Sequence, residues 1–376
     1  MNKHLIQFFK QVNKLIVKAK GCYLYDSDGK KYLDFESGDW AANLGHSRDE
    51  ISQILRTQTE KLIHDGLRFY NKESEDLAIQ LLEKLSINNG KCVFLNSGSE
   101  AVNLGITFAR NLTGRKKILK MDCSFLSSYG YGKISAENED LLNIPINEID
   151  YISQLNFSEI AAFVFEPGNS QGLVKYPSDE FIKTVANTVV QNGGLLMANE
   201  VTTGYGRTGK WFGFQHYDYR PDIVSTGKAM GNGYPISCVS VSKKISELYD
   251  KNPFRHAQSH QNDALGCAVG LKVIELFDKL DLIKESYLKG EYFLNQLFQL
   301  QKQFRDEILE VRGRGLMLAL ELNKAIPIDD IDNKLIDSGF ILGVKNNVLR
   351  FMPPLVIETS EIDRIIEKLK QIFKEL

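Results

Sequence analysis

Two short apolar runs between residues 194 and 235 constrain the fold of this chain more than any other feature. Residues 195–198 are followed at once by Asn199 and Glu200, and residues 222–226 are followed by a glycine and Lys228. Short apolar runs of this kind predict buried parallel strands. Ligands of open α/β sheets bind outside the carboxyl ends of the strands. Both strand ends are therefore expected to place their polar residues in one crevice.

Lys228 is the residue in this segment with the clearest chemical potential. Burial disfavours the charged form of a lysine and leaves a nucleophilic amine, which can form a Schiff base with a carbonyl compound. A solvated loop lysine is the ordinary alternative. The flanking glycine-rich sequence favours the nucleophile.

The same alternation of short apolar runs and helical patterns extends from about residue 48 to 270. Further runs lie at residues 93–95, 117–120, 161–165 and 238–242. This pattern predicts an α/β fold with a mostly parallel sheet that is covered by helices. A chain of 376 residues exceeds the efficient size of one core, so we expect two domains. The large domain is predicted over residues 48–270, and a smaller α+β domain over residues 1–47 and 271–376.

Both ends of the chain carry helical spacing of apolar residues. Residues 5–16 predict an amphipathic helix that packs on the protein or on a partner subunit. The C-terminal helix is predicted to begin with a capping box formed by Ser360 and Asp363. Near the N-terminus, residues 26–29 predict a turn between two short strands.

The composition excludes several classes of function. A net charge of -2 without a long basic run indicates neither nucleic acid nor an anionic membrane as a partner. No apolar stretch reaches the roughly 20 residues that span a bilayer. Five scattered cysteines indicate reduced thiols in a soluble, cytoplasmic protein. His256 and His260 are four residues apart, but no glutamate stands beside them, so we expect no metal site.

Residues 93–100 have the arrangement of a phosphate-binding site. An apolar run ends in small residues that include Gly98 and Ser99, and a helical pattern begins near Glu100. The start of a helix offers backbone N–H groups and a positive dipole end to an anion. Taken alone, the same residues are also typical of a helix N-cap. The segment by itself leaves both interpretations open.

Six motifs in order resemble the class III aminotransferases, which depend on pyridoxal phosphate. The resemblance runs from about Gly21 to the C-terminus, and its motifs are residues 96–101 (NSGSEA), 166–167 (EP), 206–209 (GRTG), 227–228 (GK), 312–315 (RGRG) and 350–355 (RFMPPL). It implies the pyridoxal-phosphate transferase fold of type I. It also implies a homodimer with shared active sites.

The resemblance assigns a role to each candidate site residue. Lys228 would hold the cofactor and move a proton, and Arg350 would bind a substrate carboxylate. The cofactor phosphate would lie against Gly98, Ser99 and the partner subunit's Ser259. The remaining cofactor-binding residues would surround the ring: Phe125 and Val201 on its two faces, Glu166 near it, Asn199 at the pyridine nitrogen and Thr202 towards the ring hydroxyl.

Several positions depart from the family pattern. Asn199 replaces the usual aspartate, which weakens the ring as an electron sink because an amide does not hold the nitrogen protonated. Residues 126–128 (LSS) replace His-Gly-Arg, whose arginine contacts a substrate carboxylate. Thr202 replaces glutamine, and residues 166–172 lack a second glutamate. These changes indicate altered handling of the substrate.

The resemblance implies an aminotransferase of amino-acid metabolism. It would move an amino group between an amino acid or ω-amine and a 2-oxo acid, with L-glutamate and 2-oxoglutarate as the expected pair, as in acetylornithine and ornithine aminotransferases. The alternative is a pyridoxal-phosphate isomerase, either an aminomutase or an amino-acid epimerase. A third hypothesis is a cofactor-binding protein that has lost catalysis.

Overall fold

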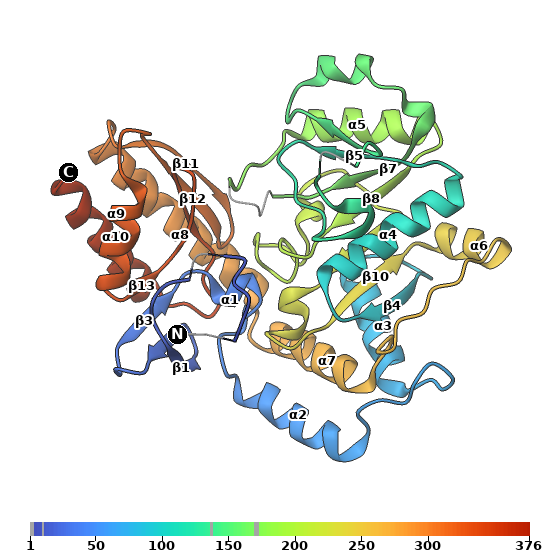
Figure 1. Ribbon diagram of the computed structural model, residues 1–376, viewed down its shortest axis with the longest axis horizontal. Helices are drawn as coiled ribbons and strands as arrows, with labels where there is room; N and C mark the ends of the chain where they lie inside the picture. The colour runs from blue at the N-terminus through green and yellow to red at the C-terminus, as the bar shows by residue number, and fades with distance from the viewer. Residues whose placement is uncertain (1–3, 10, 136–137, 169–172) are drawn as a thin grey trace.

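The computed structural model describes residues 4–9, 11–135, 138–168 and 173–376. Figure 1 shows a large sheet surrounded by helices on one side of the molecule and a smaller group of strands and helices on the other. The first strand of the chain, β1, and its last helix, α10, both belong to the smaller group. Within the described residues, no helix has both the length and the apolar character needed to cross a membrane.

The large sheet has seven strands in the order β4-β10-β9-β8-β7-β5-β6. Strands β5 to β9 are parallel, whereas β10 is antiparallel to β4 and to β9. The sheet contains all six apolar runs that the sequence predicts as strands. The edge strand β6 was missed because it is short and only partly buried. The bounds are β4 Lys91–Leu95, β5 Lys117–Met121, β6 Leu141–Ile144, β7 Ile160–Phe165, β8 Leu195–Asn199, β9 Ile223–Thr226 and β10 Ser237–Val241.

Helices cover the large sheet. Helix α4 contacts β7 to β10, and its apolar residues form a different core cluster from those of α5, which contacts β7 and β8. Every residue of β7, β8, β9 and β10 is consequently buried. The helices are α2 Asp49–Lys61, α3 Lys72–Lys84, α4 Gly98–Thr113, α5 Asp179–Gln191, α6 Lys243–Lys251 and α7 Ala264–Lys279. Short 3₁₀ turns lie at Gly130–Gly132, Ile149–Gln154, Phe157–Glu159, Gly213–His216 and Lys228–Gly231.

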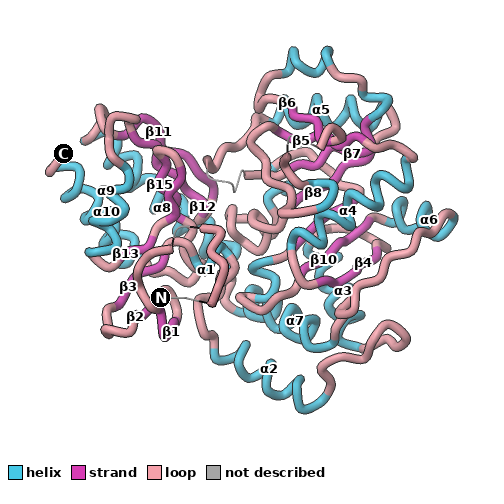
Figure 2. The backbone as a smooth tube through the Cα atoms, in the orientation of Figure 1, coloured by secondary structure: helices cyan, strands magenta, loops and turns pink. Residues whose placement is uncertain are grey.

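Two four-stranded sheets form the smaller part of the molecule (Figure 2). One sheet pairs the N-terminal strands with β13 in the order β1-β2-β3-β13, so segments from both ends of the chain share it. The other has the order β11-β12-β15-β14. The strands are β1 Ile16–Lys20, β2 Tyr23–Asp26, β3 Lys31–Asp34, β11 Ile308–Arg314, β12 Met317–Leu322, β13 Phe340–Ile341, β14 Gly343–Lys345 and β15 Val348–Phe351. The helices are α8 Leu282–Gln303, α9 Ile328–Asp337 and α10 Thr359–Lys374.

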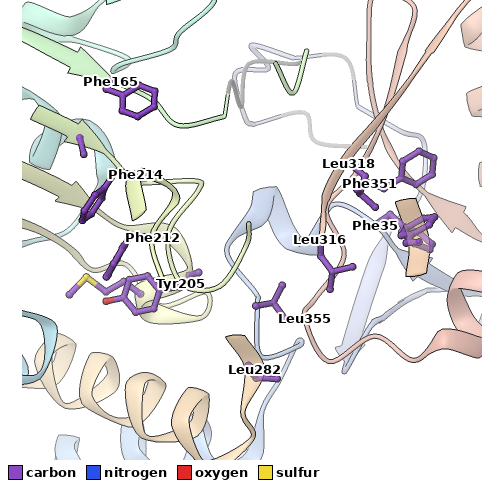
Figure 3. Close-up of a cluster of buried hydrophobic side chains, with 14 of the residues drawn as sticks. Phe35, Phe165, Tyr205, Phe212, Phe214, Leu282, Leu316, Leu318, Phe351 and Leu355 are labelled. Atoms are coloured by element: carbon purple, nitrogen blue, oxygen red, sulfur yellow. The ribbon is translucent and has the colours of Figure 1, made fainter. Parts of the chain in front are cut away.

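One apolar cluster connects the two parts of the molecule. Figure 3 shows Tyr205 and Phe212 on the side of the large sheet and Leu316 and Phe351 on the other side, with Leu355 between them. These side chains are all less than about a tenth exposed in the structure. The two parts therefore share one hydrophobic core, which holds them in a fixed position relative to each other.

Arg207 reinforces this junction with hydrogen bonds. Its fully buried guanidinium donates through Nη1 to the carbonyls of Leu316 (3.0 Å) and Pro353 (2.6 Å). Through Nη2 it donates to Ser37 Oγ (3.1 Å) and Asn43 Oδ1 (2.5 Å). The GRTG motif thus joins three segments that are distant in the sequence.

The predicted N-terminal helix is wrong. Residues 4–9 and 11–15 contain no helical turn, and β1 begins at Ile16. The apolar side chains of this segment are exposed, with Phe8 at 84% and Phe9 at 86%. Because an isolated short helix is only marginally stable, the amphipathic pattern needs a surface to pack against. All side chains of residues 4–9 and 11–16 are exposed, so the described part of this segment buries no apolar face.

The start of the C-terminal helix also differs from the prediction. The N-cap is Glu358, whose side chain forms a capping box with Glu361. Ser360 and Asp363 lie inside the helix, and Asp363 accepts a hydrogen bond from Tyr292 Oη instead. The predicted apolar face is nevertheless buried along the helix at Ile362, Ile365, Leu369, Ile372 and Phe373.

Candidate active site

A cavity of about 510 Å³ brings together nearly all the predicted site residues. Its size falls within the range of small-molecule sites. It lies at the carboxyl ends of β4, β8 and β9 and is closed on the other side by β14 and β15. The predicted residues that line it are Gly98, Ser99, Phe125, Glu166, Asn199, Val201, Thr202, Lys228 and Arg350.

The start of α4 forms one corner of the cavity. Ser97 caps the helix in a capping box with Glu100, so the N–H groups of Gly98 and Ser99 stand in the first turn without intrahelical acceptors. A Cβ at Gly98 would lie 2.5 Å from Val201 Cγ1, so only glycine allows this close approach. Free N–H groups at the positive end of a helix fit a phosphate group.

Hydrogen bonds connect the cavity residues that lie at the ends of the strands. Phe125 N donates to Glu166 Oε2 at 2.9 Å. Asn199 Nδ2 donates to the carbonyl of Phe125 at 3.1 Å, and its Oδ1 accepts from Val201 N at 3.3 Å. These contacts determine which way the Asn199 amide faces. Phe125, Glu166, Asn199 and Val201 therefore form one connected unit.

Lys228 extends its amine towards the turn at Ser37–Trp40. Its Nζ lies 3.2 Å from the carbonyl oxygen and 3.3 Å from Oδ2 of Asp39, and 4.0 Å from the centre of the Trp40 ring. Burial lowers the pKa of Lys228, whereas the Asp39 carboxylate acts in the opposite direction. A lowered pKa makes the uncharged amine more available at neutral pH.

The turn that carries Asp39 and Trp40 has an unusual backbone. All four residues of the segment labelled α1, Ser37–Trp40, have positive φ angles of 43°, 60°, 60° and 67°. Such a left-handed turn costs roughly 1–2 kcal/mol per non-glycine residue. Ser37 Oγ anchors it by donating to the Met352 carbonyl at 2.8 Å, and Asp34 accepts from Gly38 N at 3.3 Å. Strained backbone of this kind concentrates at functional sites.

Arg350 on β15 also lines the cavity. Its Nη2 lies 3.4 Å from Glu36 Oε1, and its guanidinium carbon lies 5.0 Å from the centre of the Trp40 ring. Burial raises the pKa of Glu36, and the Arg350 charge opposes this shift. Gly343 pairs with Arg350 on the neighbouring strand, where a Cβ would lie 2.0 Å from Glu36 Oε1. The Glu36–Arg350 pair therefore depends on a glycine opposite it.

Eight residues of this site were not among the predicted site residues. Glu36 contacts Arg350, while the others line the cavity: Phe9, Asp39, Trp40, Ser97, Leu126, Ser128 and Lys345. The turn residues gave no periodic signal, because left-handed turns have no characteristic apolar pattern. A tryptophan and two acids just before the Leu44-Gly45-His46 turn were the available clue.

Ser259 is the one predicted site residue that the structure does not bring to the cavity. It is exposed and is absent from the described lining of that cavity. Of the two histidines considered as metal ligands, His260 lies near His64 and Asp263, with their ligating atoms within 4.8 Å of one another. Asp263 already bonds both rings, at 2.5 Å each. The segment that lacks a second glutamate falls partly on residues 169–172, outside the described residues.

Comparison with known proteins places the chain in a family. The family model for class III aminotransferases matches residues 9–128 and 124–373. The acetylornithine aminotransferase of Archaeoglobus fulgidus is 31% identical over 97% of each chain. Among solved structures, the acetylornithine aminotransferase of Elizabethkingia anophelis has a TM-score of 0.87 at 26% identity and covers 100% of this chain and 97% of its own.

A Bacillus anthracis aminotransferase has a TM-score of 0.90 at 27% identity, again covering 100% of this chain and 97% of its own. The large parallel sheet, the helix start at Gly98 and the placement of Lys228 agree with the type I fold of pyridoxal-phosphate enzymes. The chain belongs to the class III aminotransferases, which depend on pyridoxal phosphate.

Proposed function

We propose that this aminotransferase uses L-glutamate and 2-oxoglutarate as one substrate pair and an acetylornithine- or ornithine-like amine as the other donor, within amino-acid metabolism. The observation that carries the proposal is that Lys228 and Arg350 line the same cavity. An amine for transfer and a buried arginine for a carboxylate are the two groups that an amino acid requires. Two relatives named above are acetylornithine aminotransferases, which supports the second donor.

The residues present fit pyridoxal phosphate. Gly98 and Ser99 would bind its phosphate, and Phe125 and Val201 would flank its ring, with Glu166, Asn199 and Thr202 around the edge. When bound, the cofactor accepts the amino group and withdraws electrons from the substrate carbon. Lys228 would hold the cofactor.

Lys228 also has the properties of the proton carrier. In its uncharged form, Nζ accepts the proton released from the substrate carbon that bears the amino group. The resulting ammonium then acts as the acid. The lowered pKa of Lys228 supports this double role, because it increases the share of the uncharged amine at a given pH. Arg350 orients the substrate by two parallel hydrogen bonds to its carboxylate.

We further propose a cytoplasmic homodimer in which the partner subunit's Ser259 completes the phosphate site. The exposure of Ser259, and its position outside the cavity of its own chain, support this arrangement. Exposed apolar residues such as Phe69 (73%) and Tyr70 (99%) are also typical of a surface that is covered by a partner. We retain residues 48–270 as the large cofactor-binding domain, and residues 1–47 with 271–376 as the small domain.

The absorption spectrum of the protein with pyridoxal phosphate tests this proposal. L-Glutamate is added without any oxo acid, and the visible band of the bound cofactor should disappear and return when 2-oxoglutarate follows. The Lys228→Ala variant is the control and should show neither change. A wild-type band that glutamate leaves unchanged would rule out the glutamate pair.

An isomerase is the second candidate function, and Asn199 is the observation that favours it. The amide at this position supplies no negative charge to the ring nitrogen, and both of its polar atoms already bond the backbone. Weaker electron withdrawal suits a reaction in which the amine stays on the substrate. Loss of optical activity of an amino acid without any oxo acid would identify an epimerase.

A further inference from the structure

We propose that Lys345 binds the second carboxylate of a dicarboxylic substrate whose first carboxylate is held by Arg350. This inference rests on the proposed function and names the substrate class of its carboxylate end: short dicarboxylic amino and oxo acids. The residue lies on β14 and lines the cavity that contains Lys228 and Arg350. Lys345 lies outside the family motifs of the sequence.

The register of the β14–β15 hairpin places the two cations on one face. Gly343 pairs with Arg350 and Lys345 pairs with Val348. Alternate residues of a strand share a face, so Lys345 and Arg350 are diagonal neighbours on the same side of the hairpin. Diagonal neighbours in antiparallel pairs lie about 7–8 Å apart, within reach of long side chains. Two cationic groups at this spacing suit the two ends of a short dicarboxylate.

Arg350 and Lys345 differ in the hydrogen-bond and ion-pair partners that they already have. Arg350 is buried and faces Glu36, whereas Lys345 is exposed and forms no hydrogen bond or ion pair within the described part of the chain. Partial burial and the nearby Arg350 charge both lower the pKa of Lys345. A cation next to another cation gains most from an anion that enters between them.

Lys345 also adds a positive charge to the cavity lining. The segment 126–128 supplies Leu126 and Ser128 to the cavity lining, and neither residue carries a charge. Apart from Lys228 and Arg350, Lys345 is the cation among the described lining residues. If Lys228 is occupied with amino transfer and Arg350 with one carboxylate, Lys345 is the group left for the other.

Equilibrium binding to the cofactor-loaded enzyme tests the inference without requiring turnover. Glutarate and pentanoate have the same number of carbons, but glutarate has a second carboxylate. Their dissociation constants are measured by calorimetry for the wild type, Lys345→Ala and Lys345→Arg. Lys324→Ala is the matched control, because this exposed lysine lies outside the cavity lining.

The wild type should bind glutarate about tenfold more tightly than pentanoate, which corresponds to one charge-assisted contact at a partly exposed site. Lys345→Ala should remove this preference and leave pentanoate binding unchanged, while Lys345→Arg and Lys324→Ala should retain it. Equal loss for both ligands, no loss for either, or no measurable glutarate binding by the wild type would overturn the inference.

Steady-state kinetics separate this inference from the proposed function. Lys345→Ala should raise KM for 2-oxoglutarate about tenfold and leave kcat nearly unchanged, because the contact orients and does not react. An enzyme that lacks amino transfer from glutamate but keeps the Lys345-dependent preference for glutarate would refute the proposed function alone. Transfer from glutamate without that preference would refute the role of Lys345 alone.

Discussion

Replacement of Arg207 by methionine should destabilise the protein more than replacement of any exposed arginine. The guanidinium is fully buried and donates four hydrogen bonds to Ser37, Asn43, Leu316 and Pro353. Methionine has a similar length and is apolar, so it preserves much of the packing. It removes every donor from these four acceptors.

The expected loss is about 3–5 kcal/mol in the free energy of unfolding, because four buried neutral acceptors lose their donor at a cost of about 1–3 kcal/mol each, while the desolvation cost of the guanidinium is removed. Four hydrogen bonds to a charged group would nominally contribute more, at about 1.5–3 kcal/mol each. Burial of the guanidinium offsets part of this, as shown by the lowered pKa of Arg207. The net effect is therefore well below the sum of the four contacts.

Urea denaturation, followed by circular dichroism at a fixed cofactor concentration, measures the effect. The midpoint shift is converted with the common slope of the transition. Arg364→Met is the matched control, because Arg364 is exposed and donates a hydrogen bond to Tyr23 Oη at 3.1 Å. It should change stability by less than about 1 kcal/mol. Similar small shifts for both variants would refute the stabilising role of the Arg207 hydrogen bonds.

Two further predictions concern titratable groups. Burial raises the pKa of Glu200 from its ordinary 4.5 to about 7. Between these values the folded protein keeps a proton that the unfolded chain has lost, so stability should fall as pH rises by up to about 1.4 kcal/mol per pH unit. Glu200→Gln should flatten this fall in urea midpoints, and an unchanged slope would contradict it. Asp39→Asn should lower the pH midpoint for borohydride trapping of the cofactor at Lys228, because Asp39 raises that pKa; the surface variant Asp49→Asn should not.

The architecture was largely predictable because burial leaves a strong trace in the sequence. Strands that are buried on both faces, such as β7, appear as unbroken apolar runs. The edge strand β6 has one fully buried residue, so it leaves little trace. The N-terminal segment failed for the opposite reason. Its pattern is strongly amphipathic, but periodicity records the need for an apolar partner and does not show that the single chain provides one.

The site was predictable where its residues end strands or begin helices. Asn199, Lys228 and Gly98 each follow a buried run, and all three line the cavity. Asp39 and Trp40 depend on four consecutive left-handed residues, which no hydrophobic pattern encodes. The position of Lys345 depends on the register of the hairpin formed by β14 and β15. Register is fixed by long-range packing and is therefore not visible in local sequence.

The stability of the molecule and the geometry of its active site share the same residues. Ser37 accepts from Arg207 and donates to Met352, so it holds the first residue of the strained turn in place. The same turn places Asp39 and Trp40 beside Lys228, and Trp40 also lies near Arg350. Strain of this kind persists only when the surroundings over-determine it. The hydrogen bonds of Arg207 supply that constraint. In Arg207→Met the turn should therefore relax, and Lys228 should lose its contact with Asp39, while the protein is still folded.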